Sequence, residues 1–290
     1  MGKGMSRVEY LNSCILCTSQ QINYLDRTYG FMKCSACGLV FDNPRPTQAT
    51  IAEHYSKPEQ YDEWFALLKA RQRLWRRRIR KVRRHAVPGS LLDVGAGIGE
   101  FLSVARPFFT EVTGTEISTS AISFASENFG LSLLQGTVES LPQLRPVDNL
   151  TMFHVLEHVA SPKSTLERCY GLVKPGGRLF VCVPNDVRAW PSRLRALKSR
   201  IRPNGKSAIT GLPRWEETTE IHLSHFTARS LTFGVVAAGF RVLFLRNDPF
   251  YAAYGLRLAL HSANYFVHET LRLPTYQCIW LVAEKPATLR

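Results

Sequence analysis

The stretch that decides the fold is Leu91-Leu92-Asp93-Val94-Gly95-Ala96-Gly97-Ile98-Gly99-Glu100-Phe101. An apolar run meets an acid, glycines then follow at every second position, and a helical pattern begins after Gly99. This order predicts a buried strand, a tight turn and a helix N-terminus. Glycines let a ligand approach the backbone closely, and a helix start offers free N–H groups to it. The alternative is a strand, turn and helix without a ligand.

The composition is that of an ordinary globular protein with a basic surface. The 290 residues are 45% hydrophobic and 21% charged, and 37 Lys+Arg against 23 Asp+Glu give a formal net charge of +14. The positive excess indicates an anionic partner: nucleic acid, an anionic membrane surface or a negatively charged substrate. The sequence shows neither a signal-peptide core nor an apolar run of spanning length. We therefore expect a cytoplasmic protein, with a peripheral membrane location as the alternative and the oligomeric state left open.

Two Cys-x-x-Cys pairs lie near the N-terminus, with sixteen residues between them: Cys14 and Cys17, then Cys34 and Cys37. This spacing is typical of a tetrahedral four-cysteine zinc site, which is structural because it leaves no coordination position open. The metal would supply folding energy that so short a segment lacks. A redox pair is the alternative. The other three cysteines fall in helix or strand patterns and are predicted to be small core residues: Cys169, Cys182 and Cys278.

A basic amphipathic helix is predicted over residues 61–85. One face is apolar and carries Tyr61, Trp64, Phe65, Leu68, Trp75, Ile79 and Val82. The rest of its surface is assigned nine cations: Arg71, Arg73, Arg76, Arg77, Arg78, Arg80, Lys81, Arg83 and Arg84. A solvated face, a contact with an anionic membrane and a contact with RNA are the three alternatives for this charge run.

Strand and helix patterns alternate through the rest of the chain. Strands are predicted over 111–116, 132–135, 148–153, 179–183, 240–245 and 276–284, and helices over 101–106, 119–129 and 163–172. Thr227 is predicted to cap a helix that ends near Gly239. The fold class is therefore α/β: a Rossmann-like, doubly wound sheet of seven strands, six parallel and one antiparallel, with its ligand at the carboxyl ends of the strands.

Three regions follow from this pattern. Residues 1–45 form a zinc ribbon, 46–88 a linker with the basic helix, and 89–290 the domain built on the large sheet. Within that domain, 186–225 is predicted to be a lid or substrate cap over the ligand crevice. Residues 249–274 are predicted to be a helical insertion that packs against the cap, with lipid contact as the alternative.

From about Gly89 to Glu284 the chain resembles the class I S-adenosylmethionine (SAM) methyltransferases. The resemblance is carried by the run from Asp93 to Gly99, the acid Glu116, the run from Phe153 to Val159 and the Leu-Val-Lys-Pro-Gly-Gly turn, in the family's order and spacing. The ribbon before these motifs and the run from Glu220 to Thr227 after them are similar to one branch. That branch comprises small-molecule methyltransferases, including zinc-bearing enzymes of sugar, lipid and secondary-metabolite pathways.

The resemblance implies that the cofactor is SAM and that a structural Zn²⁺ fills the ribbon. The carboxylate of Glu116 would accept hydrogen bonds from the ribose hydroxyls, and the adenine would lie near Val138. The implied cofactor-binding residues are Asp93, Gly95, Ala96, Gly97, Gly99, Glu116, Ile117, Val138, Glu139, Phe153 and His154.

Two groups of histidines are candidates for the chemistry. His222 and His225 would act as a general base, or as a structural pair that fastens the lid. His154, Glu157 and His158 share one face of a helical turn, similar to the Glu-x-x-Glu-His of metal-assisted O-methyltransferases. His222 or His225 would add the distant ligand there.

A second divalent cation of a softer kind, such as Zn²⁺, Mn²⁺ or Fe²⁺, is thus one hypothesis for this group. In the other, His154 lines the methionine end of SAM, and Glu157 and His158 cap or pair locally. The catalytic candidates are His222, His225 and His158.

These features together predict a SAM-dependent methyltransferase that methylates oxygen on a small or lipid-like metabolite. An RNA methyltransferase acting on ribose 2′-O or on rRNA is the rival enzyme, because the ribbon and the basic charge suit it. A non-catalytic SAM-fold binding module is the third hypothesis. The expected partner is a small-molecule or lipid-like acceptor, with a peripheral contact with an anionic membrane and a contact with RNA both left open.

Overall fold

The computed structural model describes residues 7–55, 67–187, 190–201, 203, 205–218, 220–248, 254–271 and 278–287. Its centre is a sheet of seven strands: β6 (Leu91–Val94), β7 (Val112–Glu116), β8 (Leu134–Gln135), β9 (Val147–Phe153), β10 (Val173–Pro184), β12 (Arg241–Asp248) and β13 (Cys278–Glu284). They are ordered β12-β13-β10-β9-β6-β7-β8. β13 is antiparallel to both of its neighbours, and the other pairs are parallel. The predicted sheet of six parallel strands and one antiparallel strand is confirmed.

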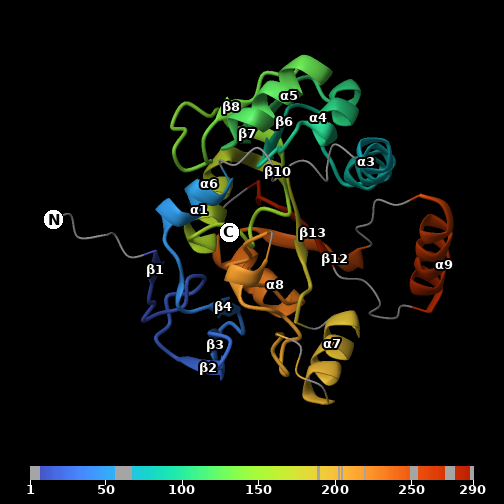
Figure 1. Ribbon diagram of the computed structural model, residues 1–290. Coiled ribbons are helices and arrows are strands. Elements are labelled where there is room, and N and C mark those ends of the chain that lie inside the picture. The colour runs from blue at the N-terminus through green and yellow to red at the C-terminus, as the bar shows by residue number, and fades with distance from the viewer. Residues whose placement is uncertain are drawn as a thin grey trace.

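Side chains of successive strand residues divide the core into two clusters, one on each face of the sheet. In β10, for example, Leu179 and Val181 join one cluster, whereas Phe180 and Cys182 join the other. The helices that contribute to the first cluster are α6 (Pro162–Leu172) and α8 (Ala228–Ala237). Those of the second are α3 (Leu68–Arg83), α4 (Glu100–Ala105) and α5 (Thr119–Phe129). Helices thus cover both faces, as a doubly wound fold requires (Figure 1).

The cysteine-bearing segment builds a second, smaller sheet. Its strands β2 (Ile22–Asp26), β3 (Phe31–Cys34) and β4 (Val40–Asp42) are joined at the edge by β11 (Ser224–His225), which comes from the region predicted to be a cap. Two short strands, β1 (Val8–Glu9) and β5 (Arg45–Pro46), pair separately, and α1 (Gln48–Tyr55) follows.

This small sheet shares a hydrophobic core with the large one. Cys14, Leu16 and Phe41 belong to the same cluster as the strand residues that face α6 and α8. A Cβ on Gly234 of α8 would lie 2.7 Å from Cδ1 of Leu16, so the ribbon contacts that helix directly. The ribbon is therefore packed as part of the main body.

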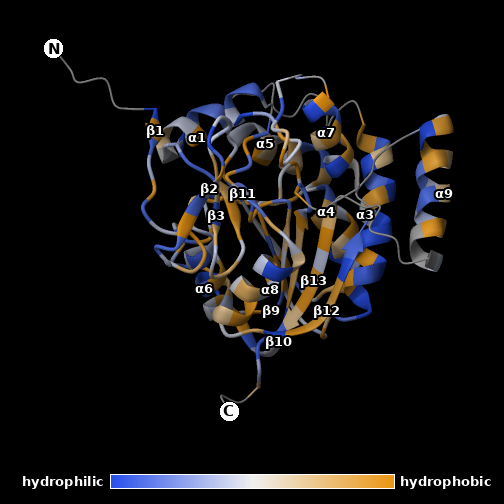
Figure 2. Cartoon of the chain, turned by 90° about the horizontal axis from the view of Figure 1, so that it is seen from below, coloured by the Kyte–Doolittle hydropathy of each residue, from blue (hydrophilic) through white to orange (hydrophobic). Residues whose placement is uncertain are grey.

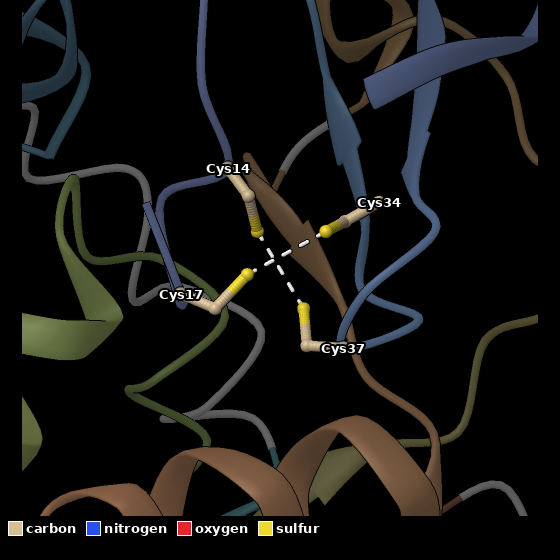
Figure 3. A group of neighbouring side chains, drawn as sticks. All are labelled: Cys14, Cys17, Cys34 and Cys37. Carbon is tan, nitrogen blue, oxygen red and sulfur yellow. Dashed lines mark hydrogen bonds between the residues drawn. The ribbon is translucent and has the colours of Figure 1, made fainter. Parts of the chain in front are cut away.

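The four cysteine sulfurs of the ribbon converge on one point (Figure 3). The Sγ atoms of Cys14 and Cys37 are 3.6 Å apart, and those of Cys17 and Cys34 are 3.5 Å apart. None of the seven cysteines forms a disulfide. Cys169, Cys182 and Cys278 are buried, as the sequence predicted.

The basic helix α3 differs from the prediction in two of its cations. Trp75, Ile79 and Val82 are buried as expected, whereas Tyr61, Trp64 and Phe65 lie outside the described residues. Arg71 and Arg78 were assigned to the charged surface, and that assignment is wrong, because both are buried. Arg78 Nη2 lies 3.3 Å from Asp248 Oδ2, and Arg71 Nε lies 2.6 Å from Glu100 Oε2. Buried acids on other elements hold these two side chains inward.

Two later segments refine the prediction. The loop-rich cap contains a helix, α7 (Trp190–Ile201), and a short 3-10 turn, η3 (Trp215–Glu217), while a second turn, η2 (Arg106–Phe108), follows α4. The insertion forms α9 (Gly255–Leu271), but its predicted packing against the cap is wrong. It lies beside α3 at the edge of the molecule (Figures 1 and 2), and its side chains are largely exposed.

Thr227 caps α8 with a reciprocal capping box, as predicted. Among the described residues, no helix combines the length and apolarity needed to cross a bilayer.

A Leu16→Ala substitution tests whether the ribbon and the large sheet unfold together. Leu16 is 2% exposed, so the cavity left behind should lower the free energy of unfolding by about 2–5 kcal/mol in a single transition. Chemical denaturation followed by tryptophan fluorescence and by far-ultraviolet circular dichroism measures this. Non-coincident transitions, or an unchanged main transition, would contradict the shared core.

Candidate active site

The glycine turn follows β6, which lies between β7 and β9 and is therefore the point where the winding of the sheet reverses. Gly95, Gly97 and Gly99 have φ angles of +67°, +54° and +79°, a region that other residues rarely adopt. A Cβ on Gly95 would also lie 2.5 Å from Cγ2 of Val155. Glycine at 95 is thus required by the backbone and by close packing as well as by ligand approach.

The carboxylate of Glu116 is fixed by backbone groups at the end of β7. Its Oε2 accepts a hydrogen bond from Gly97 N at 2.8 Å, and its Oε1 accepts from Ile117 N at 2.9 Å and Ser118 N at 3.0 Å. These bonds tie the ends of β6 and β7 together. The acid is therefore oriented by the protein itself.

A cavity of about 480 Å³ opens at these strand ends, within the size range of small-molecule sites. It is lined by ten of the eleven residues predicted to contact the cofactor: Asp93, Gly95, Ala96, Gly97, Glu116, Ile117, Val138, Glu139, Phe153 and His154. Gly99 does not line the cavity. It precedes α4, and a Cβ there would lie 3.0 Å from Ala125 and Leu131, so its role is in the turn and in packing.

One wall of the cavity comes from residues that the sequence did not single out as binding residues. Arg71 and Trp75 of α3 line it together with Glu100, and Oε2 of Glu100 accepts hydrogen bonds from both, at 2.6 Å and 3.2 Å. In the sequence, the one sign of this wall is Glu100, an acid at a position where the dinucleotide fingerprint has a small residue. Its partners are 29 and 25 residues away within a run of cations, and no local pattern separates Arg71 from the others.

Asp93 is the acid of the turn, and it lines the cavity while buried in the sheet. Thr151 Oγ1 donates to its Oδ1 at 2.6 Å. Burial raises the pKa of Asp93 to about 7, and the neighbouring charge of Glu116 adds to the rise. A carboxyl of this kind changes charge near neutral pH at the wall of a ligand site.

Of the three histidines predicted to be catalytic, His158 lines the cavity. Its Nδ1 lies 2.7 Å from the carbonyl oxygen of Ile221, and since a carbonyl only accepts, Nδ1 carries the hydrogen. Burial lowers the pKa of His158, so the ring is neutral at pH 7 and Nε2 holds a lone pair. This nitrogen can accept a proton or bind a cation.

His222 and His225, predicted as a general base or as a structural pair, do not line the cavity. His225 Nε2 is 3.0 Å from Asp42 Oδ1 of β4, and its Nδ1 is 3.6 Å from Asp186 Oδ2. His222 Nδ1 lies 3.0 Å from the same Asp186 oxygen. Burial disfavours charge on His225, but Asp186 and Asp42 outweigh it and raise its pKa to about 9. His225 thus fastens the cap region to the ribbon, while His222 contacts Asp186 within the cap region.

The carboxylate of Glu157 lies near the imidazoles of His154 and His158. It is 1% exposed, and neither carboxylate oxygen has a hydrogen-bond partner among the described residues. Its Oε1 is 3.4 Å from His154 Nδ1 and 3.8 Å from His158 Nε2. Burial raises the pKa of Glu157, but these imidazoles outweigh it and hold the pKa below its usual value. The result is a buried, ionised carboxylate whose oxygens accept no hydrogen bond from the described residues.

Ligand atoms of Glu157, His158 and His222 lie within 4.8 Å of one another, a donor set of two imidazoles and one carboxylate. His154, predicted as a fourth member, gathers instead with Cys182 and Cys278, whose sulfurs are 3.8 Å and 3.9 Å from its Nε2. Its backbone φ of +58° is unusual for a residue other than glycine, which marks a strained position at the cavity wall.

The known proteins that this chain resembles include methyltransferases. A family model described as a methyltransferase domain matches residues 67–244. The chain is similar to the ubiquinone biosynthesis O-methyltransferase of Pectobacterium carotovorum, with 28% identity over 159 residues, 47% of this chain and 64% of that protein. It is 33% identical over 109 residues to the enzyme of the same name from Serratia proteamaculans, covering 35% of this chain and 45% of that protein. The matched region thus spans about half to two thirds of these relatives.

Solved structures share the fold. A chain from the complex between the Haloferax volcanii Trm112 methyltransferase activator and the putative methyltransferase aligns with a TM-score of 0.56 and 19% identity, covering 80% of this chain and 98% of that one. A possible histamine N-methyltransferase from Thermotoga maritima aligns with a TM-score of 0.53 and 18% identity, covering 81% and 99%. At these identities the likeness shows the fold alone.

The charge of Asp93 predicts how cofactor binding depends on pH. Ionised Asp93 attracts a cationic ligand such as the sulfonium SAM, and the protonated form does not. The affinity for SAM should therefore rise about tenfold between about pH 6 and pH 8, as the carboxyl titrates through its pKa of about 7. Calorimetric titration measures this, with Asp93→Asn as the control that binds weakly at all pH values. A pH-independent affinity in the unmodified protein would contradict the role of Asp93.

Proposed function

The chain belongs to the methyltransferase-domain family, and we propose that this SAM-dependent methyltransferase methylates an oxygen of a small, lipid-like acceptor. The observation that carries the proposal is one cavity that joins the glycine turn and Glu116 to the neutral imidazole of His158. Apolar side chains make up much of its wall, among them Ile51, Trp75 and Phe153, which suits an apolar acceptor. The O-methyltransferase relatives support oxygen as the atom that is methylated.

The residues of the cavity fit SAM along its length. Three backbone N–H groups orient the carboxylate of Glu116. Its remaining acceptor capacity would be used by the ribose hydroxyls. Asp93 and the Arg71–Glu100 pair supply both charge signs for the amino and carboxylate groups of the methionine end. When bound, SAM supplies a methyl group on a sulfonium, which is a good leaving group. The protein therefore has to align the acceptor and remove its proton.

His158 is proposed to take that proton through Nε2. The Ile221 carbonyl fixes the ring through Nδ1, so the lone pair on Nε2 has one orientation. Protonation creates an imidazolium 3.8 Å from Glu157 Oε1, and this buried carboxylate stabilises the new charge. Glu157 is thus a positioning and charge-stabilising residue, and His158 is the general base.

A His158→Gln variant tests the base. Turnover should fall by roughly 10²–10⁴-fold, the usual contribution of a general base, while the affinity for SAM stays the same. Transfer of isotope-labelled methyl from SAM to water-soluble phenol and alcohol acceptors measures the first, and calorimetry the second. His85→Gln serves as the control because His85 is at the far end of α3 and does not line the cavity. Full turnover in His158→Gln would remove this residue from the mechanism.

A divalent cation is the second candidate for the same residues, and the unpartnered oxygens of Glu157 favour it. Glu157, His158 and His222 would hold the ion. The other ring nitrogens are already engaged, His158 Nδ1 with Ile221 and His222 Nδ1 with Asp186, as orienting partners commonly are in metal sites. Held there, a divalent cation would supply Lewis acidity toward an acceptor hydroxyl.

We also propose that the ribbon cysteines hold a structural Zn²⁺. A tetrahedral ion with Zn–S bonds of about 2.3 Å separates its sulfurs by about 3.8 Å, close to the 3.5 Å and 3.6 Å found here. Burial raises the pKa of Cys17 to about 11, so an ion is needed to hold this thiol ionised at neutral pH. Because the ribbon shares the main core, loss of the ion would destabilise the whole protein.

The number of metal ions bound per chain tests the ribbon zinc site and the second cation site in one experiment. Cys37→Ser should lose zinc and unfold at a lower temperature, whereas Cys169→Ser, a buried thiol outside the cluster, should keep zinc. His222→Ala should keep the ribbon zinc and lose a second ion if the cation candidate is correct. Atomic emission spectrometry after dialysis measures the number of metal ions per chain. Zinc retained in Cys37→Ser would contradict the ribbon site, and equal counts in His222→Ala and the unmodified protein would contradict the second site.

A further inference from the structure

We propose that the exposed cations of α3 and the outward apolar side chains of α9 form one docking surface for an anionic phospholipid bilayer. This inference rests on the proposed function, because it brings the active-site cavity to the place where a lipid-like acceptor resides. The two helices lie side by side at the edge of the molecule, and Figure 2 shows α3 between α9 and the body of the protein. We call the two sets of side chains the α3–α9 surface.

α9 turns its apolar side outward. Leu256, Leu260, Ala263 and Val267 are spaced by four, three and four residues, so they share one helix face. Leu256 is 76% exposed and Leu260 is 61% exposed, and the adjacent Phe266 is 72% exposed. Orange bands alternate with blue ones along α9 in Figure 2. A face of this kind costs free energy in water and indicates an apolar partner.

The opposite side of α9 faces α3. The hydroxyl of Tyr254, just before the helix, accepts a hydrogen bond from Ala70 N at 3.1 Å. The guanidinium of Arg73 lies 5.0 Å from the ring centre of Tyr254, and that of Arg77 lies 5.5 Å from the ring centre of Tyr265. Tyr265 is nine residues after Leu256, which is half a turn away from it around the helix. Cation–π contacts with α3 thus orient α9 with its leucines toward solvent.

α3 supplies the charge. Its 16 residues include nine Lys or Arg and no acid. Arg71 and Arg78 turn inward to pair with Glu100 and Asp248, whereas Arg76 and Arg80 are exposed and one helical turn apart. The inward cations line or support the cavity, and the outward ones leave a positive surface on the other side of the same helix.

Exposed apolar side chains on α9 beside exposed cations on α3 favour an anionic bilayer over other anionic partners. An anionic bilayer has a charged headgroup layer above an apolar layer, and an amphipathic helix buries its apolar side at that boundary while nearby cations bind headgroups. RNA would engage the arginines but would leave Leu256 and Leu260 in water. Docking through this surface also places α3 on the membrane side of the molecule, with the Arg71 and Trp75 wall of the cavity on the inner side of that helix.

Vesicle co-sedimentation of the full chain, without acceptor, tests the surface. We expect binding to vesicles of phosphatidylcholine with phosphatidylglycerol, and much weaker binding to phosphatidylcholine alone. Neutralising both exposed cations in Arg76→Gln/Arg80→Gln should weaken binding roughly 20- to 30-fold, since each cation near an anionic membrane contributes about fivefold. Leu260→Glu should abolish binding.

Matched controls come from α7, which also exposes cations and apolar side chains. Arg193→Gln/Lys198→Gln changes the net charge equally, and Leu197→Glu places the same acid at a position that is 51% exposed. Both should bind vesicles like the unmodified protein.

Three results would overturn the proposal: no binding to anionic vesicles, equal losses in the α7 variants, or retention by RNA alone that depends on Arg76 and Arg80. Circular dichroism and SAM affinity should be unchanged in every variant. Methylation of a water-soluble acceptor is scored separately. A protein that binds vesicles but methylates no oxygen would refute the proposed function and leave the docking surface standing.

Discussion

The hydrogen bond from Gly97 N to the carboxylate of Glu116 is the constraint on which the site depends. It joins the loops that follow two neighbouring parallel strands, and it forms only because the glycine turn adopts positive φ angles. Without Glu116, the N–H groups of Gly97, Ile117 and Ser118 would lose their acceptor at a cost of about 1–3 kcal/mol for each one left unpaired. The floor of the cavity is thus built by the backbone, and the ligand finds its acceptor already oriented.

Around this floor, three separate parts of the chain enclose one cavity. α3 brings Arg71 and Trp75 against Glu100, the end of β9 brings His154 and His158, and Glu220 comes from the segment before β11. That segment is held to the ribbon by strand pairing with β4 and by the His225–Asp42 contact. The four-cysteine ribbon therefore stabilises the region that adjoins His158, although no ribbon cysteine lines the cavity. The zinc ion that we propose for the ribbon would therefore act on the reaction only by stabilising this region.

Features encoded by adjacent residues were predictable from the sequence. The glycine turn, the strand that ends at Glu116, the paired cysteines and the Thr227 cap each depend on residues within a few positions of one another. Features that depend on a distant partner were not. Arg71 and Arg78 look like their neighbours in a charge run, and only Glu100 and Asp248 select them for burial. His225 resembles a catalytic histidine until Asp42, 183 residues away, is seen beside it. The periodicity of α9 showed an amphipathic helix, but not which side would meet the protein.

The central claim is that SAM lies on Glu116 with its reacting end toward His158. The most direct measurement is a crystal structure of the protein with S-adenosylhomocysteine bound. We expect the ribose hydroxyls on the carboxylate of Glu116, the amino-acid end near Asp93 and Arg71, and the sulfur facing the side of the cavity lined by His158. A ligand bound elsewhere, or a sulfur directed away from His158, would contradict it.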